Sequence, residues 1–98
     1  MPEAPSFDPL IHAPHRLRIC AIANAATHVE FGELQQRLGL SKSALSKHVS
    51  QLVQHGYLHE DSVKRGGHLR LRLSLTDRGR SAYRGHTAAL IEIMEAAN

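Results

Sequence analysis

Apolar positions recur with helical spacing in the middle of the chain. Between residues 42 and 55, four of them fall at i, i+4, i+7 and i+8 and form one stripe along a helix, namely Leu45, Val49, Leu52 and Val53. Ser41 precedes the stripe and is a good N-cap, whereas Gly56 suits the helix end. The pattern therefore predicts a helix over residues 42–55.

Shorter elements are predicted before this helix. Residues 1–9 hold three of the four prolines, so we expect a flexible N-terminal tail. Asp8 suits a helix N-cap and Pro9 the first turn, which predicts a short helical turn through His12. Pro14 starts a helix to about Ala26, and residues 29–31 form a brief strand. A further helix over 31–38 carries apolar residues at helical spacing, and Gly39 fits its left-handed end.

The segment after the long helix reads as a β-hairpin. Residues 57–63 form one strand, and Lys64 to Gly67 form a turn whose glycines tolerate positive φ. The stretch HLRLRLSL then alternates strictly. Its leucines (Leu69, Leu71, Leu73, Leu75) share one face, and its polar residues (His68, Arg70, Arg72, Ser74) share the other. This alternation predicts a half-buried strand with a basic outer face.

Together these elements predict a mainly α fold with a small β-hairpin wing, a winged helix-turn-helix. The helices over 31–38 and 42–55 are separated by a turn at Gly39-Leu40, which is the spacing of a helix-turn-helix. The second helix would be the recognition helix that enters a DNA major groove, and the hairpin over 57–75 would be the wing. We expect residues 10–98 to form one such domain, ending in a C-terminal helix from Asp77 to about Ala97.

The face of the recognition helix opposite its apolar stripe carries short hydroxyls and lysines. A solvated helix face usually mixes acids with lysines, but Glu33 is the only acid between residues 31 and 59. Small hydroxyls allow close approach to another surface, and lysines near a helix N-terminus suit phosphates. The predicted DNA contacts of this helix are Ser41, Lys42, Ser43, Ser46, Lys47, Ser50 and, at its flank, His48.

The hairpin concentrates the positive charge of the chain. Residues 42–72 contain six Lys or Arg against two acids, an excess of four, whereas the whole chain carries +3. The predicted DNA contacts of the wing are Lys64, Arg65, Gly66, Gly67, Arg70 and Arg72. We expect Arg65 at the minor groove, and Arg70 and Arg72 on phosphates. The alternative is an ordinary hairpin whose arginines protect an edge strand from pairing with other chains.

The motifs LSKSALSKHVSQLVQHGYL and LTDRGRSAY, together with the basic hairpin, resemble small stand-alone winged-helix regulators of the MarR and ArsR type. The resemblance extends over about residues 8–95, and it implies that Thr76 caps the C-terminal helix. It also implies a DNA-binding transcriptional regulator, which we expect to be a repressor, although an activator stays open. A winged-helix module that binds protein instead of DNA remains the alternative, although the positive recognition helix favours DNA.

We expect a homodimer for three reasons. One recognition helix and one wing read only a few base pairs, too few for specificity in a genome. The resemblance implies dimers in which the N-terminal helical region packs against the C-terminal helix of the partner. The C-terminal helix is also more apolar than a lone terminal helix requires. The predicted interface comprises Leu10, Ile11, Leu17, Tyr83, Leu90, Ile93, Met94 and Ala97.

Composition narrows the remaining functions. The chain has 98 residues, 42% of them hydrophobic, without an apolar run long enough for a membrane. Its first residues lack the pattern of a signal peptide, so we expect a cytoplasmic protein. Enzyme motifs are missing, and we expect no cofactor. The chain has eight histidines but only one cysteine, Cys20, so it lacks a cysteine pair for a metal site, and we expect none. Cys20 lies among apolar residues, where a buried thiol is inert, so we do not expect a redox sensor. The sequence does not identify an effector.

Overall fold

The computed structural model describes residues 3–97; Met1, Pro2 and Asn98, which belong to the expected tail and the end of the expected domain, lie outside them. The elements run in the order α1 (Pro9–His12), α2 (Pro14–Asn24), β1 (Val29–Glu30), α3 (Phe31–Leu38), α4 (Lys42–Gln54), β2 (Leu58–Arg65), β3 (His68–Leu75) and α5 (Asp77–Ala96). This mainly helical arrangement with one hairpin confirms the predicted fold class. No helix among residues 3–97 is both long and apolar enough to cross a bilayer.

The helix-turn-helix forms where local capping signals place it. Gly39 adopts the left-handed conformation at the end of α3, with φ 65°. The Ser41 hydroxyl then accepts a hydrogen bond of 3.1 Å from the Ala44 amide at the start of α4. Because these two signals are two residues apart, α3 and α4 are joined by a tight turn.

One hydrophobic core holds the helices and the foot of the hairpin together. The α4 stripe is buried at Leu45, Val49 and Leu52. These side chains pack in a cluster with α2, where Ile19, Cys20 and Ala23 are buried, and with the following further buried residues: Ile11, Val29, Leu34, Leu38, Leu58, Leu73 and Leu75. Helix α2 lies at the centre of this arrangement, in contact with the other four helices and with β3.

The sheet has three antiparallel strands in the order β1-β3-β2. Strand β2 continues through Arg65, which pairs with His68, so the turn contains only Gly66 and Gly67. Both glycines have positive φ, 57° and 81°, as a two-residue hairpin turn requires. The predicted four-residue turn over 64–67 was therefore too long, because Lys64 and Arg65 still pair as strand residues.

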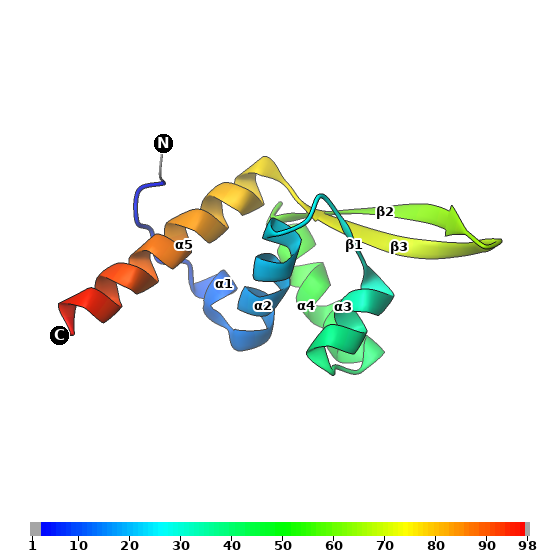
Figure 1. The fold of residues 1–98 in the computed structure, drawn as a ribbon, viewed down its shortest axis with the longest axis horizontal. Coiled ribbons are helices and arrows are strands. Elements are labelled where there is room, and N and C mark those ends of the chain that lie inside the picture. The colour runs from blue at the N-terminus through cyan, green and yellow to red at the C-terminus, as the bar shows by residue number, and fades with distance from the viewer. Residues whose placement is uncertain (1–2, 98) are drawn as a thin grey trace.

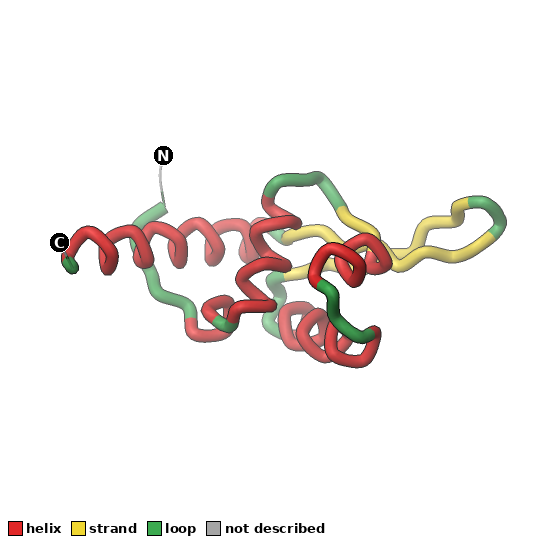
Figure 2. Tube along the Cα trace, turned by 60° about the horizontal axis from the view of Figure 1, so that its bottom comes forward, coloured by secondary structure: helices red, strands yellow, loops and turns green. Residues whose placement is uncertain are grey.

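The hairpin extends well beyond the helical body, and this limits burial along β3. In Figures 1 and 2, β2 and β3 project away from the helices at one end of the molecule, while the C-terminal part of α5 projects at the other. Strand β1 pairs only with Leu73 and Arg72 of β3. Leu73 and Leu75 are consequently buried, but Leu69 is 73% exposed. The expected half-buried face is thus confirmed only at the foot of the wing.

The N-terminal segment contacts the body and is not the loose tail that we expected. The Ser6 amide donates to the Gly85 carbonyl at 2.9 Å, and the Ser81 hydroxyl donates to Glu3 at 3.0 Å. The Asp8 amide donates to Nδ1 of the buried His86 at 3.0 Å. Residues 3–8 therefore lie along α5, because hydrogen-bond partners on that helix offset the cost of ordering the chain.

Helix α5 begins at the foot of the wing in a closely packed junction. The Thr76 hydroxyl accepts from the Gly79 amide at 2.9 Å, which confirms the predicted cap. A Cβ on Gly79 would overlap the Tyr57 carbonyl. Arg80 donates to the carbonyl and the side chain of Asn24, at 3.1 and 2.8 Å. These contacts hold the start of α5 against both the foot of β2 and the end of α2.

Candidate nucleic-acid interface

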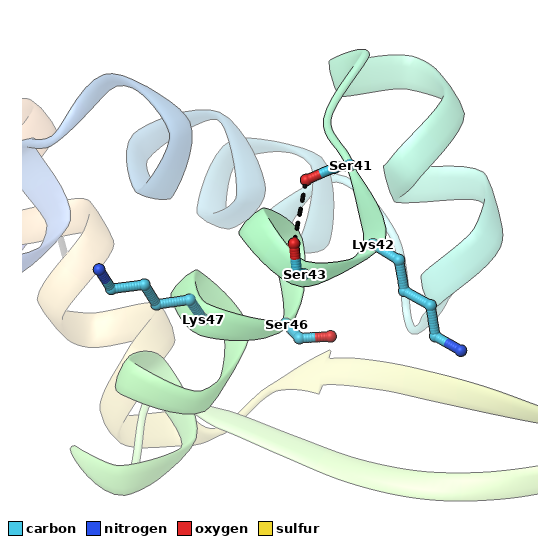
Figure 3. Close-up of a pocket in the computed structure, with 5 residues that line it drawn as sticks. All are labelled: Ser41, Lys42, Ser43, Ser46 and Lys47. Carbon is cyan, nitrogen blue, oxygen red and sulfur yellow. Dashed lines mark hydrogen bonds between the residues drawn. The ribbon is translucent and has the colours of Figure 1, made fainter.

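The first two turns of α4 present five polar side chains around one shallow hollow. The hollow has a volume of about 790 Å³ and is lined by Ser41, Lys42, Ser43, Ser46 and Lys47. All five residues are exposed. Figure 3 shows Lys42 and Lys47 extending in opposite directions from the helix, with Ser43 and Ser46 between them. The structure therefore brings together five of the seven residues predicted on the recognition helix.

The electrostatics of this surface favour an anionic ligand. Helix α4 contains no acidic residue. Within residues 3–97, neither Lys42 nor Lys47 takes part in an ion pair. The helix N-terminus adds partial positive charge from its free amide groups. Because the serines are short, a backbone or a base edge could approach the helix closely between the two ammonium groups.

His48 and Ser50 lie outside this surface. His48 is half-buried and faces α2, where its Nδ1 lies 3.3 Å from Nη1 of Arg16 and its ring 5.5 Å from that of His15. Desolvation, together with the positive charge of Arg16, holds the pKa of His48 below its usual value. The expected phosphate contact of His48 is replaced by this helix–helix contact. Ser50 is exposed further along α4 and does not line the hollow.

Arg72 forms an ion pair with Asp61 within the wing. Arg72 and Asp61 are directly opposite each other on β3 and β2. The guanidinium donates to both carboxylate oxygens, at 2.9 and 2.7 Å. This hydrogen bonding to Arg72 lowers the pKa of Asp61. Because Nε and Nη2 have acceptors in Asp61, Arg72 would have to give up this pair or use Nη1 to reach a phosphate, and its DNA contact stays a prediction.

The other wing cations divide into two groups. Arg65 donates to the Glu30 carboxylate, although its side chain remains 70% exposed. Lys64 and Arg70 are exposed and take part in no ion pair among residues 3–97. Gly66 and Gly67 are exposed at the tip. The wing thus presents two unpaired cations and one arginine that would have to exchange its carboxylate partner on binding.

Sequence reasoning missed Arg16, which holds α4 in position from outside the hollow. Its guanidinium donates to the Leu10 carbonyl at 2.5 Å and to the Gln51 side chain at 3.1 Å, in addition to the His48 contact. It therefore ties α4 to α1 across α2. Because Arg16 and Gln51 are 35 positions apart, no local pattern could have indicated their contact.

The residues predicted at a dimer interface occupy different environments. Ile11 is fully buried in the core of its own chain, so it has no surface left for a partner and is withdrawn. Leu10, Leu17 and Tyr83 are partly buried against that core, and Leu90 is half-buried. The remaining predicted residues, Ile93, Met94 and Ala97, are exposed. Ile91 adds to the exposed apolar surface at the end of α5.

The single cysteine is placed for packing. Cys20 is buried, and burial with the nearby charge of Asp8 raises the pKa of its thiol to about 12. A thiol with so high a pKa is unreactive at neutral pH. Among the described residues, no three His, Cys, Asp or Glu side chains gather in a group that could hold a metal ion.

Several solved structures share this fold. A transcriptional regulator homologue from Pyrococcus horikoshii OT3 superposes with a TM-score of 0.85 at 20% identity, over 91% of this chain and 88% of that one. HlyU from Vibrio cholerae superposes with a TM-score of 0.59 at 25% identity, over 90% of this chain and 83% of that one. The PcaV transcriptional regulator from Streptomyces coelicolor, solved with its natural ligand, superposes with a TM-score of 0.70 at 23% identity, over 92% of this chain and 62% of that one.

A search of curated proteins gives no sequence match. The family model described as a winged helix DNA-binding domain matches residues 15–94, which include the helix-turn-helix, the wing and most of α5. This confirms the resemblance to winged-helix regulators. The chain therefore belongs to the winged helix DNA-binding domain family.

Proposed function

We propose that this protein is a transcriptional regulator that binds a specific sequence of double-stranded DNA as a homodimer. The observation that carries the proposal is the first half of α4, where two lysines without ion-pair partners in the described chain flank exposed serines around one hollow. A major groove about 12 Å wide admits one α-helix. Ser43, Ser46 and Lys47 would meet base edges, and Lys42 a phosphate.

The wing would contact the same duplex beside the recognition helix. Lys64 and Arg70, which take part in no ion pair among the described residues, would contact phosphates. Arg65 would leave Glu30 and approach the minor groove, whose negative potential attracts arginine where the groove narrows. Exposed Gly66 and Gly67 have no side chain to hold the turn away from the sugar-phosphate backbone.

The proposed dimer forms through the C-terminal part of α5. Ile91, Ile93 and Met94 are 51%, 56% and 61% exposed there, and an apolar cluster of this kind on a projecting helix is typical of an interaction surface. Leu10, Leu17, Tyr83, Leu90 and Ala97 would contribute around them. Two copies related by a two-fold axis would place their recognition helices about 34–36 Å apart, in successive major grooves. Bound at a promoter, such a dimer would repress by blocking access.

A winged helix that binds another protein is the second candidate function. The exposed apolar end of α5 is the observation that favours it. Such a module would have no need for the uninterrupted positive surface of α4. An α5 variant that no longer binds a partner protein but still binds DNA would show that the two functions use different surfaces.

Selection of binding sites from random duplex DNA with the purified protein tests the proposal. We expect enriched sequences with inverted half-sites about one helical turn apart. Leu90→Asp with Met94→Asp should yield monomers in sedimentation and lose this enrichment. No enrichment by the wild-type protein would contradict sequence-specific binding, and a double variant that stays dimeric would place the interface elsewhere.

A further inference from the structure

A second hollow lies between α3 and the wing. Its volume is about 470 Å³, within the range of about 300–1,000 Å³ that is typical of ligand sites. Phe31 and Gln35 line it from α3, Lys42 from the start of α4, and Leu69, Arg70 and Leu71 from β3. We call this hollow the wing notch.

The β3 wall of the wing notch is an open strand edge. Strand β1 covers β3 only at Leu73 and Arg72, so on that side residues 68–71 have no neighbouring strand within the described chain. Three consecutive residues of β3 line the notch, which indicates that the edge of the strand faces it and not one face alone. An open edge leaves backbone amides and carbonyls to be satisfied by solvent or by a ligand.

The wing notch combines apolar and cationic side chains. Leu69 is 73% exposed, and Leu71 and Phe31 are partly buried beside it. Lys42 and Arg70 supply positive charge, and no acid lines the notch. The two acids at the start of α3 have other partners, since Glu30 accepts from Arg65 and Glu33 from Arg37. A hollow lined by an exposed leucine and two cations suits a ligand with an apolar body and an anionic group.

The wing notch is continuous with the recognition surface. Lys42 lines both hollows, the one on α4 and the one beside the wing. A duplex whose major groove receives α4 would therefore pass its backbone over Lys42. The nearest anionic group of such a ligand is a backbone phosphate, and the apolar body attached to it is a deoxyribose.

We propose that the wing notch seats one deoxyribose-phosphate unit of the DNA backbone. The phosphate would lie between Lys42 and Arg70, and the Gln35 amide could donate to it. The sugar would pack against Leu69 and Leu71. This inference rests on the proposed function and adds to it an apolar contact that fixes the register of the wing on the duplex.

The test measures the affinity of the full chain for a random-sequence duplex of about 24 base pairs by fluorescence anisotropy, over a series of salt concentrations. Leu69→Ser should weaken binding about five- to tenfold, because it removes apolar contact area. It should leave the slope of log K against log salt unchanged. Val63→Ser, a half-buried residue of β2 outside the notch, is the matched control and should keep the affinity of the wild-type protein.

The charged variants test whether both cations meet one phosphate. Lys42→Gln combined with Arg70→Gln should lower the salt slope by about 0.9, the value for one phosphate. A loss of about 1.8 would mean two separate phosphates and would overturn the shared seat. If the wild-type protein binds DNA, and both Leu69→Ser and the charged double variant bind it equally well, the notch proposal is wrong and the proposed function stands. No DNA binding by the wild-type protein would overturn the proposed function and the notch with it.

Discussion

The Tyr57 hydroxyl donates a hydrogen bond of 2.6 Å to Oδ2 of Asp8, across 49 positions of sequence. Oδ1 of the same carboxylate caps α1 by accepting from the Leu10 and Ile11 amides, at 2.9 and 3.1 Å. The Asp8 amide in turn donates to His86. One residue therefore joins the N-terminal segment, α1, the foot of the wing and α5.

The first prediction follows from this junction. Asp8→Ala should lower the free energy of unfolding by about 2–3 kcal/mol, because it removes a helix cap and a hydrogen bond to a charged acceptor. Tyr57→Phe should cost about 1 kcal/mol, since it removes the hydrogen bond alone. Urea unfolding followed by circular dichroism measures both. Equal stability of Asp8→Ala and the wild-type protein would contradict the assigned role, and Tyr83→Phe provides a tyrosine control.

The second prediction concerns the junction of α5 with the wing. Gly79→Ala should destabilise the protein by about 2 kcal/mol or more, because the added methyl group meets backbone atoms of Tyr57 that cannot move without shifting β2. Gly32→Ala is the matched control, since nothing lies within 4 Å of its new Cβ. Thermal unfolding should show a lower midpoint for Gly79→Ala only. Equal midpoints would mean that the junction is loosely packed.

The third prediction is that acid destabilises the fold through His86. Nδ1 of this buried residue accepts a hydrogen bond, and Nε2 lies 3.2 Å from Nδ1 of His12. Desolvation and the neighbouring His12 lower the pKa of His86, against an opposing effect of Asp8. Because the pKa of His86 in the folded state lies below the unfolded value of about 6.5, the contribution of His86 to the free energy of unfolding is complete above that pH. It is lost as the pH falls toward the folded-state pKa.

Unfolding in urea at about pH 7.5 and about pH 5.5 measures this effect. The wild-type protein should be less stable at the lower pH, and His86→Gln should show a smaller difference. Some pH dependence should remain in that variant, because the pKa of His48 is lowered as well. His68→Gln, at the exposed end of the wing, is the control. An unchanged pH difference in His86→Gln would exclude this histidine as the cause.

The fourth prediction concerns the Arg65–Glu30 pair. If Arg65 binds DNA, Glu30→Gln should raise DNA affinity severalfold, since Arg65 no longer has to leave a carboxylate worth about 0–1 kcal/mol. Glu33→Gln removes a neighbouring negative charge and should have a smaller effect. In an Arg65→Gln background the gain from Glu30→Gln should shrink. A gain of the same size in that background would show that Arg65 takes no part.

The elements set by local signals could be predicted from the sequence. Asp8, Ser41 and Thr76 cap the helices that follow them, and Gly39 ends α3. Each signal acts within about four residues of its own position, so it does not depend on the rest of the fold. The five residues around the α4 hollow were among the seven predicted for the same reason, because the N-cap position and helical periodicity place them opposite the buried stripe.

Errors arose where the outcome depends on pairing across the chain. Counting from a two-residue turn at Gly66-Gly67 places Asp61 opposite Arg72, as observed, whereas the four-residue turn that we expected would pair Asp61 with Arg70. The exposure of Leu69 depends on how far β1 extends along β3, which the alternation of β3 does not encode. The contact of His48 with Arg16 likewise requires the packing of α2 on α4.

The central claim is that the first half of α4 binds duplex DNA. The most direct measurement is the affinity of the Ser46→Glu/Lys47→Glu variant for a duplex obtained by selection with the wild-type protein, compared by fluorescence anisotropy. We predict a loss of about 100-fold or more, because two carboxylates would face the phosphates and base edges. Gln54→Glu, at the exposed far end of α4, should bind nearly as well as the wild-type protein. Unchanged affinity of the double variant would contradict the account.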